Sequence, residues 1–364
     1  MLHPNFQQRL NRARNEMAKR GLEALLIFSP ENLRYLTGFS GEASFGVLSG
    51  QGIYLITDYR FVEQAQTECL GTTVICRDRD RQTLGNVFAE ILSSERTSNI
   101  GIESEHLSHD SWLSVETALV KFNLLPSTGL IEHLRMCKDE WEIAQIKEAA
   151  AIADAALQAL LSQLELGVTE KHMAHELDYL VRSHGADDVA FPTILGFGSN
   201  SARPHCVPSQ RPLMSGDIVL IDFGAVVNGY RSDMTRTFVA GRPTAQQSMM
   251  MATVLRAQEA AIAAVRPGIA GFEVDEQAER VFASSPFKAH AGKGLGHGIG
   301  LKLHELPFLG QKCGEILKAG FVVTIEPGLY IPQYGGVRYE DDILIEESGA
   351  KVLTKSPKFF ELDI

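Results

Sequence analysis

Two aspartates, Asp222 and Asp233, stand eleven residues apart on either side of Asn228-Gly229. Asn-Gly between apolar runs is the strongest short signal for a two-residue hairpin turn. A hairpin with this turn places both aspartates on one face as diagonal neighbours, about 7–8 Å apart at Cα. Two carboxylates at that separation can share one or two cations, and without a cation they repel each other. The alternative is that both are unrelated polar residues on a solvated face.

Two glutamates form a second pair of this kind. Glu326 and Glu340 flank a loop rich in proline and glycine, within FVVTIEPGLYIPQYGGVRYEDDILI. A hairpin centred on Gln333 sets them opposite each other, where like charges destabilise a sheet unless something positive lies between them. The alternative is an edge pair whose charges are balanced by Arg338.

One histidine, His297, lies in a glycine-rich run, GKGLGHGIG. Glycines lack side chains, so backbone, metal or substrate can approach closely. His304 follows seven residues later. It returns to the same side as His297 if the segment is helical, and it faces the opposite side if the segment is extended. An ordinary core or surface role is the alternative for both histidines.

Together these segments supply four carboxylates and one imidazole: Asp222, Asp233, His297, Glu326 and Glu340. Hard oxygen ligands with a single nitrogen suit Mn²⁺, Co²⁺ or Zn²⁺, and the number of carboxylates fits two ions that share a water. Two ions about 3.5–4 Å apart generate hydroxide near neutral pH and polarise a carbonyl. The set therefore predicts the site of a metal-dependent hydrolase.

Strand and helix signals alternate through the first third of the chain, from the apolar run at 24–28 to the strand-like segment at 99–102. This alternation predicts an α/β domain with a mixed sheet over residues 1–134. A boundary falls near 135–139, where Asp139 and Glu142 form the capping-box pair of a long helix.

The remaining residues, 135–364, predict a different architecture. Glycine-punctuated, β-branched runs occur at 218–224, 229–240, 320–331 and 336–345, and helical patterns at 169–183, 245–265 and 274–283. Paired hairpins with intervening helices predict an α+β domain with a strongly curved antiparallel sheet. The two helix-then-hairpin halves suggest an old internal duplication.

Composition excludes several classes of function. The 364 residues carry 34 Lys+Arg and 45 Asp+Glu, a formal net charge of −11, and no basic block, so neither nucleic acid nor an anionic membrane is an expected partner. No apolar run approaches the roughly 18 residues that span a membrane, and the N-terminal segment lacks an apolar signal core. The five cysteines are scattered and never in a CxxC spacing. This usage fits a reducing compartment, and we expect a cytoplasmic protein.

The order and spacing of the five residues resemble those of the pita-bread metallopeptidases, the family of prolidase, aminopeptidase P, methionine aminopeptidase and creatinase. The matching segments are NSARPH, IDFGAVVNGYRSDMTRTF, GLGHGIGLKLHELP, TIEPGLY and GGVRYEDDILI. The resemblance covers the whole chain, because the first third resembles the N-terminal domain of prolidase and aminopeptidase P, which methionine aminopeptidases lack. Creatinase has this domain but lacks the metal ligands. The resemblance implies a creatinase-type N-terminal α/β domain, 1–134, before a pita-bread catalytic domain, 135–364.

The resemblance also implies a role for each candidate ligand. Asp222 would hold one metal, His297 and Glu326 would hold the other, and Asp233 and Glu340 would bridge both. The bridging hydroxide would attack the carbonyl before a proline. Glu326 would shuttle the proton, first as a general base and then as a general acid.

Further residues are implied around these ligands. His205 and His304 would hydrogen-bond the substrate and stabilise the oxyanion. Arg338 would orient a bridging carboxylate. Phe191 would help to line an apolar proline pocket, with a plain core role as the alternative. Lys293 departs from the pattern, because relatives commonly carry a histidine there. It could bind a product-side carboxylate or point to solvent.

The implied activity is that of an Xaa-Pro aminopeptidase, which hydrolyses the bond between an N-terminal residue and proline. Two divalent ions per chain are implied, Mn²⁺ first with Co²⁺ or Zn²⁺ as alternatives, in a homodimer that acts on proline-containing peptides. The enzymatic alternative is an Xaa-Pro dipeptidase (prolidase) restricted to dipeptides, which must recognise the free carboxylate just past proline. The alternative from another class is a non-catalytic peptide-binding module, although like charges kept close without a cation are costly.

Overall fold

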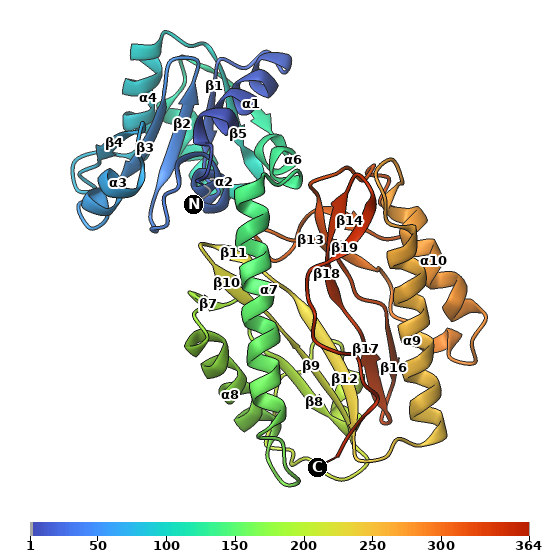
Figure 1. Cartoon of the computed structure of the whole chain (residues 1–364). Coiled ribbons are helices and arrows are strands. Elements are labelled where there is room, and N and C mark those ends of the chain that lie inside the picture. Colours follow the sequence, from blue (N-terminus) through green and yellow to red (C-terminus); the bar gives the residue numbers. More distant parts are fainter. Residues whose placement is uncertain (1–2, 364) are drawn as a thin grey trace. The chain divides into compact units, whose positions relative to one another are not determined.

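The computed structural model describes residues 3–363, which divide into two compact units, 3–135 and 136–363 (Figure 1). Each unit has its own hydrophobic core. The expected boundary between residues 134 and 135 falls within helix α6 (Leu130–Met136).

A six-stranded sheet with the order β4-β3-β2-β1-β5-β6 forms the centre of the N-terminal unit. β2 runs antiparallel to both of its neighbours, and the other pairs are parallel. This is the mixed sheet that the alternating signals predicted. The strands are β1 (Ala24–Ile27), β2 (Phe45–Ser49), β3 (Ile53–Thr57), β4 (Thr73–Cys76), β5 (Asn99–Glu103) and β6 (Asn123–Ser127). The helices are α1 (Phe6–Lys19), α2 (Pro30–Thr37), α3 (Val62–Glu68), α4 (Leu84–Glu95), α5 (His109–Ala118) and α6, with a 3-10 turn at Ser104–His106.

Strand β1 lies at the centre of the hydrophobic core of this unit. All four of its residues are apolar and buried, as a strand that is covered on both faces requires. Phe28 follows directly and packs edge to face against Phe45 and Phe88, with ring centroids 5.7 Å apart in each pair.

The helices of the C-terminal unit are α7 (Glu140–Leu161), α8 (Glu170–Ser183), α9 (Ala245–Ala264) and α10 (Gly271–Ala283), with 3-10 turns at Gly198–Ala202 and Lys288–His290. α7 begins with the predicted capping box of Asp139 and Glu142. α10 begins three residues before the expected position, because the Glu273 carboxylate accepts a hydrogen bond from the backbone N–H of Ala270. In Figure 1, α7 and α8 lie beside β8–β11, and α9 and α10 flank the strands from β13 to β17.

The strands of this unit form sheets with the orders β20-β12-β9-β8, β11-β10-β7, β14-β13-β15-β18-β19 and β16-β17. All pairs are antiparallel except β12 with β20. The strands are β7 (Asp188–Val189), β8 (Ile194–Phe197), β9 (Ile218–Phe223), β10 (Ala225–Val227), β11 (Tyr230–Arg231), β12 (Met234–Ala240), β13 (Gly296–Gly298), β14 (Glu305–Leu309), β15 (Val322–Ile325), β16 (Gly328–Ile331), β17 (Gly335–Arg338), β18 (Asp341–Glu346), β19 (Gly349–Val352) and β20 (Glu361–Leu362).

The antiparallel arrangement was predicted, but each long hairpin is divided between two sheets. The first divides at Gly224, where an added Cβ would lie 1.9 Å from the carbonyl oxygen of Ser232. The second divides where β15 passes into β16 and β17 passes into β18. A strand that bends out of its ladder changes the direction of its side chains. These interruptions therefore decide where the acidic residues point.

Among the described residues, no helix is both long enough and apolar enough to cross a membrane. All five cysteines carry free thiols.

Candidate metal centre

The first hairpin brings Asp222 and Asp233 to one face. β9 pairs with β12 so that Asp222 lies opposite Thr235, and Asp233 is two residues before Thr235 on the same strand side. The turn is at Asn228-Gly229, as the sequence predicted, with positive φ angles of 48° and 82°. The two aspartates are therefore diagonal neighbours, and both are buried.

The second hairpin brings Glu326 opposite Glu340. Ile325 pairs with Asp341 on one side of the interruption, and Gly328 pairs with Arg338 on the other. One register runs through both pairings, so the two glutamates face each other in the gap between the sheets. This is the register that a hairpin centred on Gln333 predicted.

His297 lies in the middle of β13 and His304 in the turn just before β14. The segment is neither helical nor extended throughout, because β13 and β14 form an irregular antiparallel pair. This turn brings the imidazoles together, with ring centroids 4.3 Å apart and ring planes at 76°.

The glycines beside His297 make room for neighbouring strands. A Cβ on Gly296 would lie 2.0 Å from the carbonyl oxygen of Thr324, and a Cβ on Gly298 would lie 2.3 Å from that of Leu306. We expected these glycines to let backbone, metal or substrate approach closely. In the structure Gly296 and Gly298 admit the neighbouring backbone at Thr324 and Leu306, which fixes β13 and the direction of the His297 side chain.

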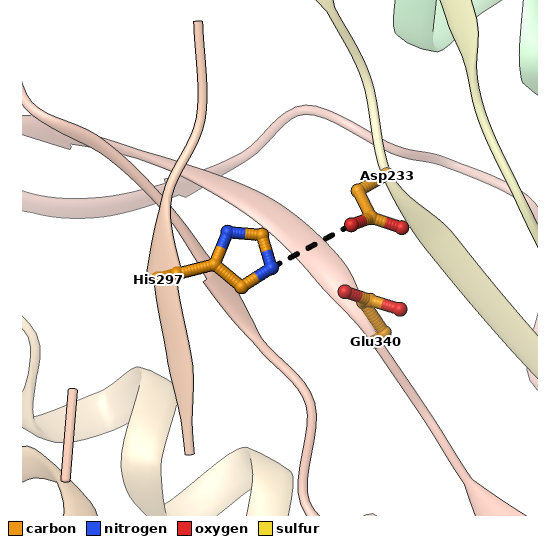
Figure 2. Close-up of side chains that lie close together, drawn as sticks. All are labelled: Asp233, His297 and Glu340. Carbon is orange, nitrogen blue, oxygen red and sulfur yellow. Dashed lines mark ion pairs between the residues drawn. The ribbon is translucent and has the colours of Figure 1, made fainter. Parts of the chain in front are cut away.

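The three hairpins converge on one point. Ligand atoms of Asp233, His297 and Glu340 all lie within 4.8 Å of one another (Figure 2). The Nε2 of His297 lies 3.7 Å from a carboxylate oxygen of Asp233 and 3.3 Å from Oε1 of Glu326. Figure 2 shows the three labelled side chains pointing toward a common centre from different strands.

The imidazole of His297 is oriented by its own backbone. Its Nδ1 lies 3.0 Å from the carbonyl oxygen of Gly298, so Nδ1–H donates there and the lone pair of Nε2 faces the carboxylates. Burial acts to lower the pKa of His297, but the contact with Glu326 raises it overall. The tautomer protonated at Nδ1, with the lone pair of Nε2 free, is the one that a metal ligand needs.

Each of three buried carboxylates has one oxygen without a hydrogen-bond partner among the described residues: Oδ1 of Asp222, Oδ1 of Asp233 and Oε1 of Glu340. Burial, reinforced by the neighbouring carboxylates, raises the pKa of Asp233 and of Glu340 well above the ordinary value. Burial also raises the pKa of Asp222, although Arg338 opposes it. Buried anionic oxygens without partners are costly unless they bind a cation. The donor set therefore fits divalent metal ions.

The other oxygens of Asp222 and Glu340 are held by neighbouring side chains. The Arg338 guanidinium donates to Oδ2 of Asp222, and its Nε donates to Oγ1 of Thr235 at 3.0 Å. Thr235 in turn donates to Oε2 of Glu340 at 2.6 Å. The resemblance implied that Arg338 orients a bridging carboxylate. In the structure it contacts Asp222 and reaches Glu340 through Thr235.

Sequence reasoning missed several of these supporting residues. Thr324 donates to Oε1 of Glu326 at 3.0 Å, and the backbone N–H of Asp233 donates to Oδ2 of Asp342 at 3.1 Å. Burial raises the pKa of Asp342 to about 8. Tyr330 accepts a hydrogen bond from Arg338 at 2.6 Å. The acidic run Glu340-Asp341-Asp342 was the available signal for Asp342, but nothing in the sequence set the threonines apart.

Glu170, on the first turn of α8, is a further residue that sequence reasoning missed. It is fully buried and accepts hydrogen bonds from the backbone N–H of Phe197 at 2.8 Å and from that of Ser209 at 2.9 Å. Its carboxylate also accepts from Asn200 at 2.9 Å. The segment between these residues carries His205, so Glu170 fixes both ends of the loop that presents this histidine.

A cavity of about 490 Å³ opens over the converging side chains. This volume suits a small ligand. All ten residues proposed from the sequence line it: Phe191, His205, Asp222, Asp233, Lys293, His297, His304, Glu326, Arg338 and Glu340. Apolar residues share the lining, namely Pro192, Ile194, Val207 and Leu303.

Known proteins resemble the chain in both parts. Residues 144–347 match the model of metallopeptidase family M24, and residues 9–137 match the creatinase/prolidase N-terminal domain. The chain belongs to metallopeptidase family M24. The family predicted from the motifs is thus confirmed, as are the two-part fold and a peptidase activity.

Relatives of this M24 metallopeptidase match it over nearly its full length. An uncharacterized peptidase of Bacillus subtilis, YqhT, is 37% identical over 350 residues, 96% of this chain and 98% of that one. The solved structure of an Xaa-Pro dipeptidase from Bacillus anthracis gives a TM-score of 0.94 at 34% identity, covering 98% of this chain and 100% of that one. An X-Pro aminopeptidase from Thermotoga maritima gives 0.88 at 32%, covering 96% and 100%.

Proposed function

We propose that this metallopeptidase hydrolyses the bond between an N-terminal residue and a proline in second position. The observation that carries the proposal is the set of buried carboxylate oxygens without partners, which face a cavity of small-ligand size. The names of the relatives from B. anthracis and T. maritima, an Xaa-Pro dipeptidase and an X-Pro aminopeptidase, support the choice of bond.

The proposed cofactor is two divalent ions per chain, Mn²⁺ first, with Co²⁺ or Zn²⁺ as alternatives. Four carboxylates and one imidazole converge at the site, a donor set rich in oxygen that suits these ions. Asp222 would hold one ion, and His297 with Glu326 the other. Asp233 and Glu340, whose ligand atoms lie within 4.8 Å of each other and of that of His297, would serve both ions.

When bound, such ions lower the pKa of water toward neutrality and polarise the scissile carbonyl. Glu326 would take up the proton and later deliver it to the proline nitrogen. Burial acts to raise the pKa of Glu326, but His297 and Arg338 lower it overall, which keeps the carboxylate ionised and ready to accept a proton.

His304 and His205 would bind the substrate and stabilise the charge that develops on the carbonyl oxygen. Burial and the neighbouring His297 lower the pKa of His304, so its imidazole is neutral at pH 7 and can donate one hydrogen bond. His205 is exposed on the loop that Glu170 holds.

Selectivity for proline would come from shape. An Xaa-Pro bond is a tertiary amide without an N–H, so recognition through backbone pairing loses one contact. The apolar wall that includes Phe191, Ile194 and Val207 would accommodate the pyrrolidine ring.

Substrate length is part of the proposal. We favour an Xaa-Pro aminopeptidase that also cuts dipeptides, with a strict Xaa-Pro dipeptidase as the alternative. Relatives carry both names. A homodimer and a cytoplasmic location stay predictions.

The test is a panel of short peptides with proline in second position, assayed after chelation and after addition of Mn²⁺ or Co²⁺. We expect about two ions per chain, loss of cleavage on chelation and recovery with metal. Asp233→Asn should abolish turnover in a folded protein, whereas Glu347→Gln, in the exposed turn after β18, should not. A metal-loaded protein that cleaves none of the panel would support the non-catalytic peptide-binding module instead.

A further inference from the structure

Two basic side chains among the described residues line the cavity besides its histidines, those of Arg338 and Lys293. Arg338 is buried, and its guanidinium is committed to Asp222, Tyr330 and the carbonyl oxygen of Pro204. Lys293 is exposed, and no hydrogen bond or ion pair within residues 3–363 holds its ammonium group. The cavity therefore presents one cation that is free to bind a ligand.

The backbone that carries Lys293 is fixed on both sides. The N–H of Gly292 donates to the carbonyl oxygen of Gly328 at 2.9 Å, and the N–H of Leu295 donates to that of Leu309 at 2.9 Å. Lys293 thus projects from an anchored edge of the cavity, and only its flexible stem can move. An anchored cation loses less freedom when it binds a ligand than one on a mobile loop.

The charges of the side chains that line the cavity determine which end of a peptide the Lys293 ammonium would attract. Four carboxylates line the cavity, and two divalent ions would neutralise them. Since the ions would already balance Asp222, both Arg338 and Lys293 add positive charge, and of these two the ammonium of Lys293 has no committed partner among the described residues. A peptide has a cation at its N-terminus and an anion at its C-terminus. Lys293 would repel the first and attract the second, so the peptide would lie with its C-terminal end toward Lys293.

We propose that Lys293 binds the free carboxylate of Xaa-Pro dipeptides and so sets the preferred substrate length. The inference rests on the proposed function. In a dipeptide the carboxylate follows the scissile carbonyl by one residue, about 3.3–3.6 Å along the chain, and lies in the same cavity. In a longer peptide a neutral amide occupies that position, and its carbonyl oxygen can accept a hydrogen bond from the ammonium but carries no negative charge to form an ion pair with it. This residue would favour dipeptides within the broader Xaa-Pro specificity.

The experiment compares kcat/KM for Ala-Pro and for its C-terminal amide, with Mn²⁺ present, in the wild type and in three variants. Lys293→Met removes the charge, Lys293→Arg keeps it, and Lys312→Met removes an exposed lysine that does not line the cavity. We expect the wild type and Lys312→Met to prefer the free dipeptide. In Lys293→Met the ratio of the two kcat/KM values should fall by about 10- to 100-fold, as for the loss of one hydrogen bond to a charged group. The change should lie mainly in KM for Ala-Pro, and Lys293→Arg should restore most of the ratio.

An unchanged ratio in Lys293→Met overturns the inference and leaves the proposed function intact. Absence of cleavage of either substrate by the metal-loaded wild type overturns the proposed function. Calorimetric titration with Ala-Pro and its amide then decides the inference separately. Tighter binding of the free dipeptide that is lost in Lys293→Met supports carboxylate binding, and equal binding in both proteins refutes it.

Discussion

Removing divalent cations should destabilise the C-terminal unit, and the loss should grow as pH rises. Oxygens of Asp233 and Glu340 lie within 4.8 Å of each other. Two unit charges at that separation repel by about 3.5 kcal/mol at an effective dielectric constant of 20. Burial and mutual repulsion raise the pKa values of both groups well above the ordinary range, so without metal the protonated forms are favoured.

The sign of the pH dependence follows from this direction. A carboxyl group whose pKa is raised on folding contributes stability below its unfolded pKa, near 4, and loses it as pH rises through the folded value. The metal-free protein should therefore unfold at lower temperature at pH 8 than at pH 6. Metal binds the ionised form, so its effect should be larger at pH 8.

The size of the effect can be stated for one ion. Metal at 100 times its dissociation constant stabilises by about 2.7 kcal/mol. At about 2–4 °C per kcal/mol for a unit of this size, Tm should rise by about 5–10 °C. Thermal unfolding with chelator and with Mn²⁺, at pH 6 and pH 8, measures this shift in Tm.

The variant Asp233→Asn sharpens the test, because it removes one of the repelling charges. It should lose most of the metal-dependent shift, and without metal at pH 8 it should unfold at higher temperature than the wild type. Glu347→Gln, exposed and remote from the cavity lining, should behave as the wild type. Equal Tm with and without metal at pH 8, or an Asp233→Asn protein less stable than metal-free wild type, would refute the electrostatic reasoning.

Three other substitutions test the supporting residues. Arg338→Lys should lower kcat/KM by about 10- to 100-fold in a folded, metal-binding protein, because an ammonium cannot reproduce the fork that contacts Asp222 and Thr235; circular dichroism and metal analysis accompany the kinetics. His304→Ala should lower kcat by about 100-fold or more without changing metal stoichiometry, since it would act on the substrate; unchanged kcat would remove it from the mechanism. Glu170→Gln should cost about 1–3 kcal/mol in chemical denaturation, because the backbone N–H groups of Phe197 and Ser209 donate to different carboxylate oxygens and one of them would face an –NH2 donor in the amide.

Local turn chemistry explains why both hairpins could be predicted. Asn228-Gly229 fixes one register, and a centre at Gln333 fixes the other, with a positive φ of 64° at that residue. Once each register is set, the alternation of side chains decides which acids share a face. The sequence therefore contains enough information to pair Asp222 with Asp233.

Other features depend on contacts between segments that are remote in the chain. The position of His304 depends on how β14 pairs with β13, and the division of the hairpins depends on close approaches such as that of Gly224 to Ser232. Thr235 and Glu170 have residue types that occur in any strand or helix. Their roles follow only from the groups that pack against them in the folded chain. The sequence pattern around each residue does not indicate which groups those are.

The two oxygens of Asp222, and likewise those of Glu340, have different surroundings, and this argues against the non-catalytic peptide-binding module. In Asp222 one oxygen is bound by Arg338, and in Glu340 one is bound by Thr235. The second oxygen of each is buried and has no partner among residues 3–363. A site kept only for its fold would gain stability by giving that second oxygen a donor or by replacing the acid with an apolar residue. For the ionised carboxylate, an arrangement that orients one oxygen and leaves the other without a donor is favourable only when a cation completes it. The same hydrogen bonds that hold these acids in place therefore also keep their second oxygens available to the divalent ions that the site would bind.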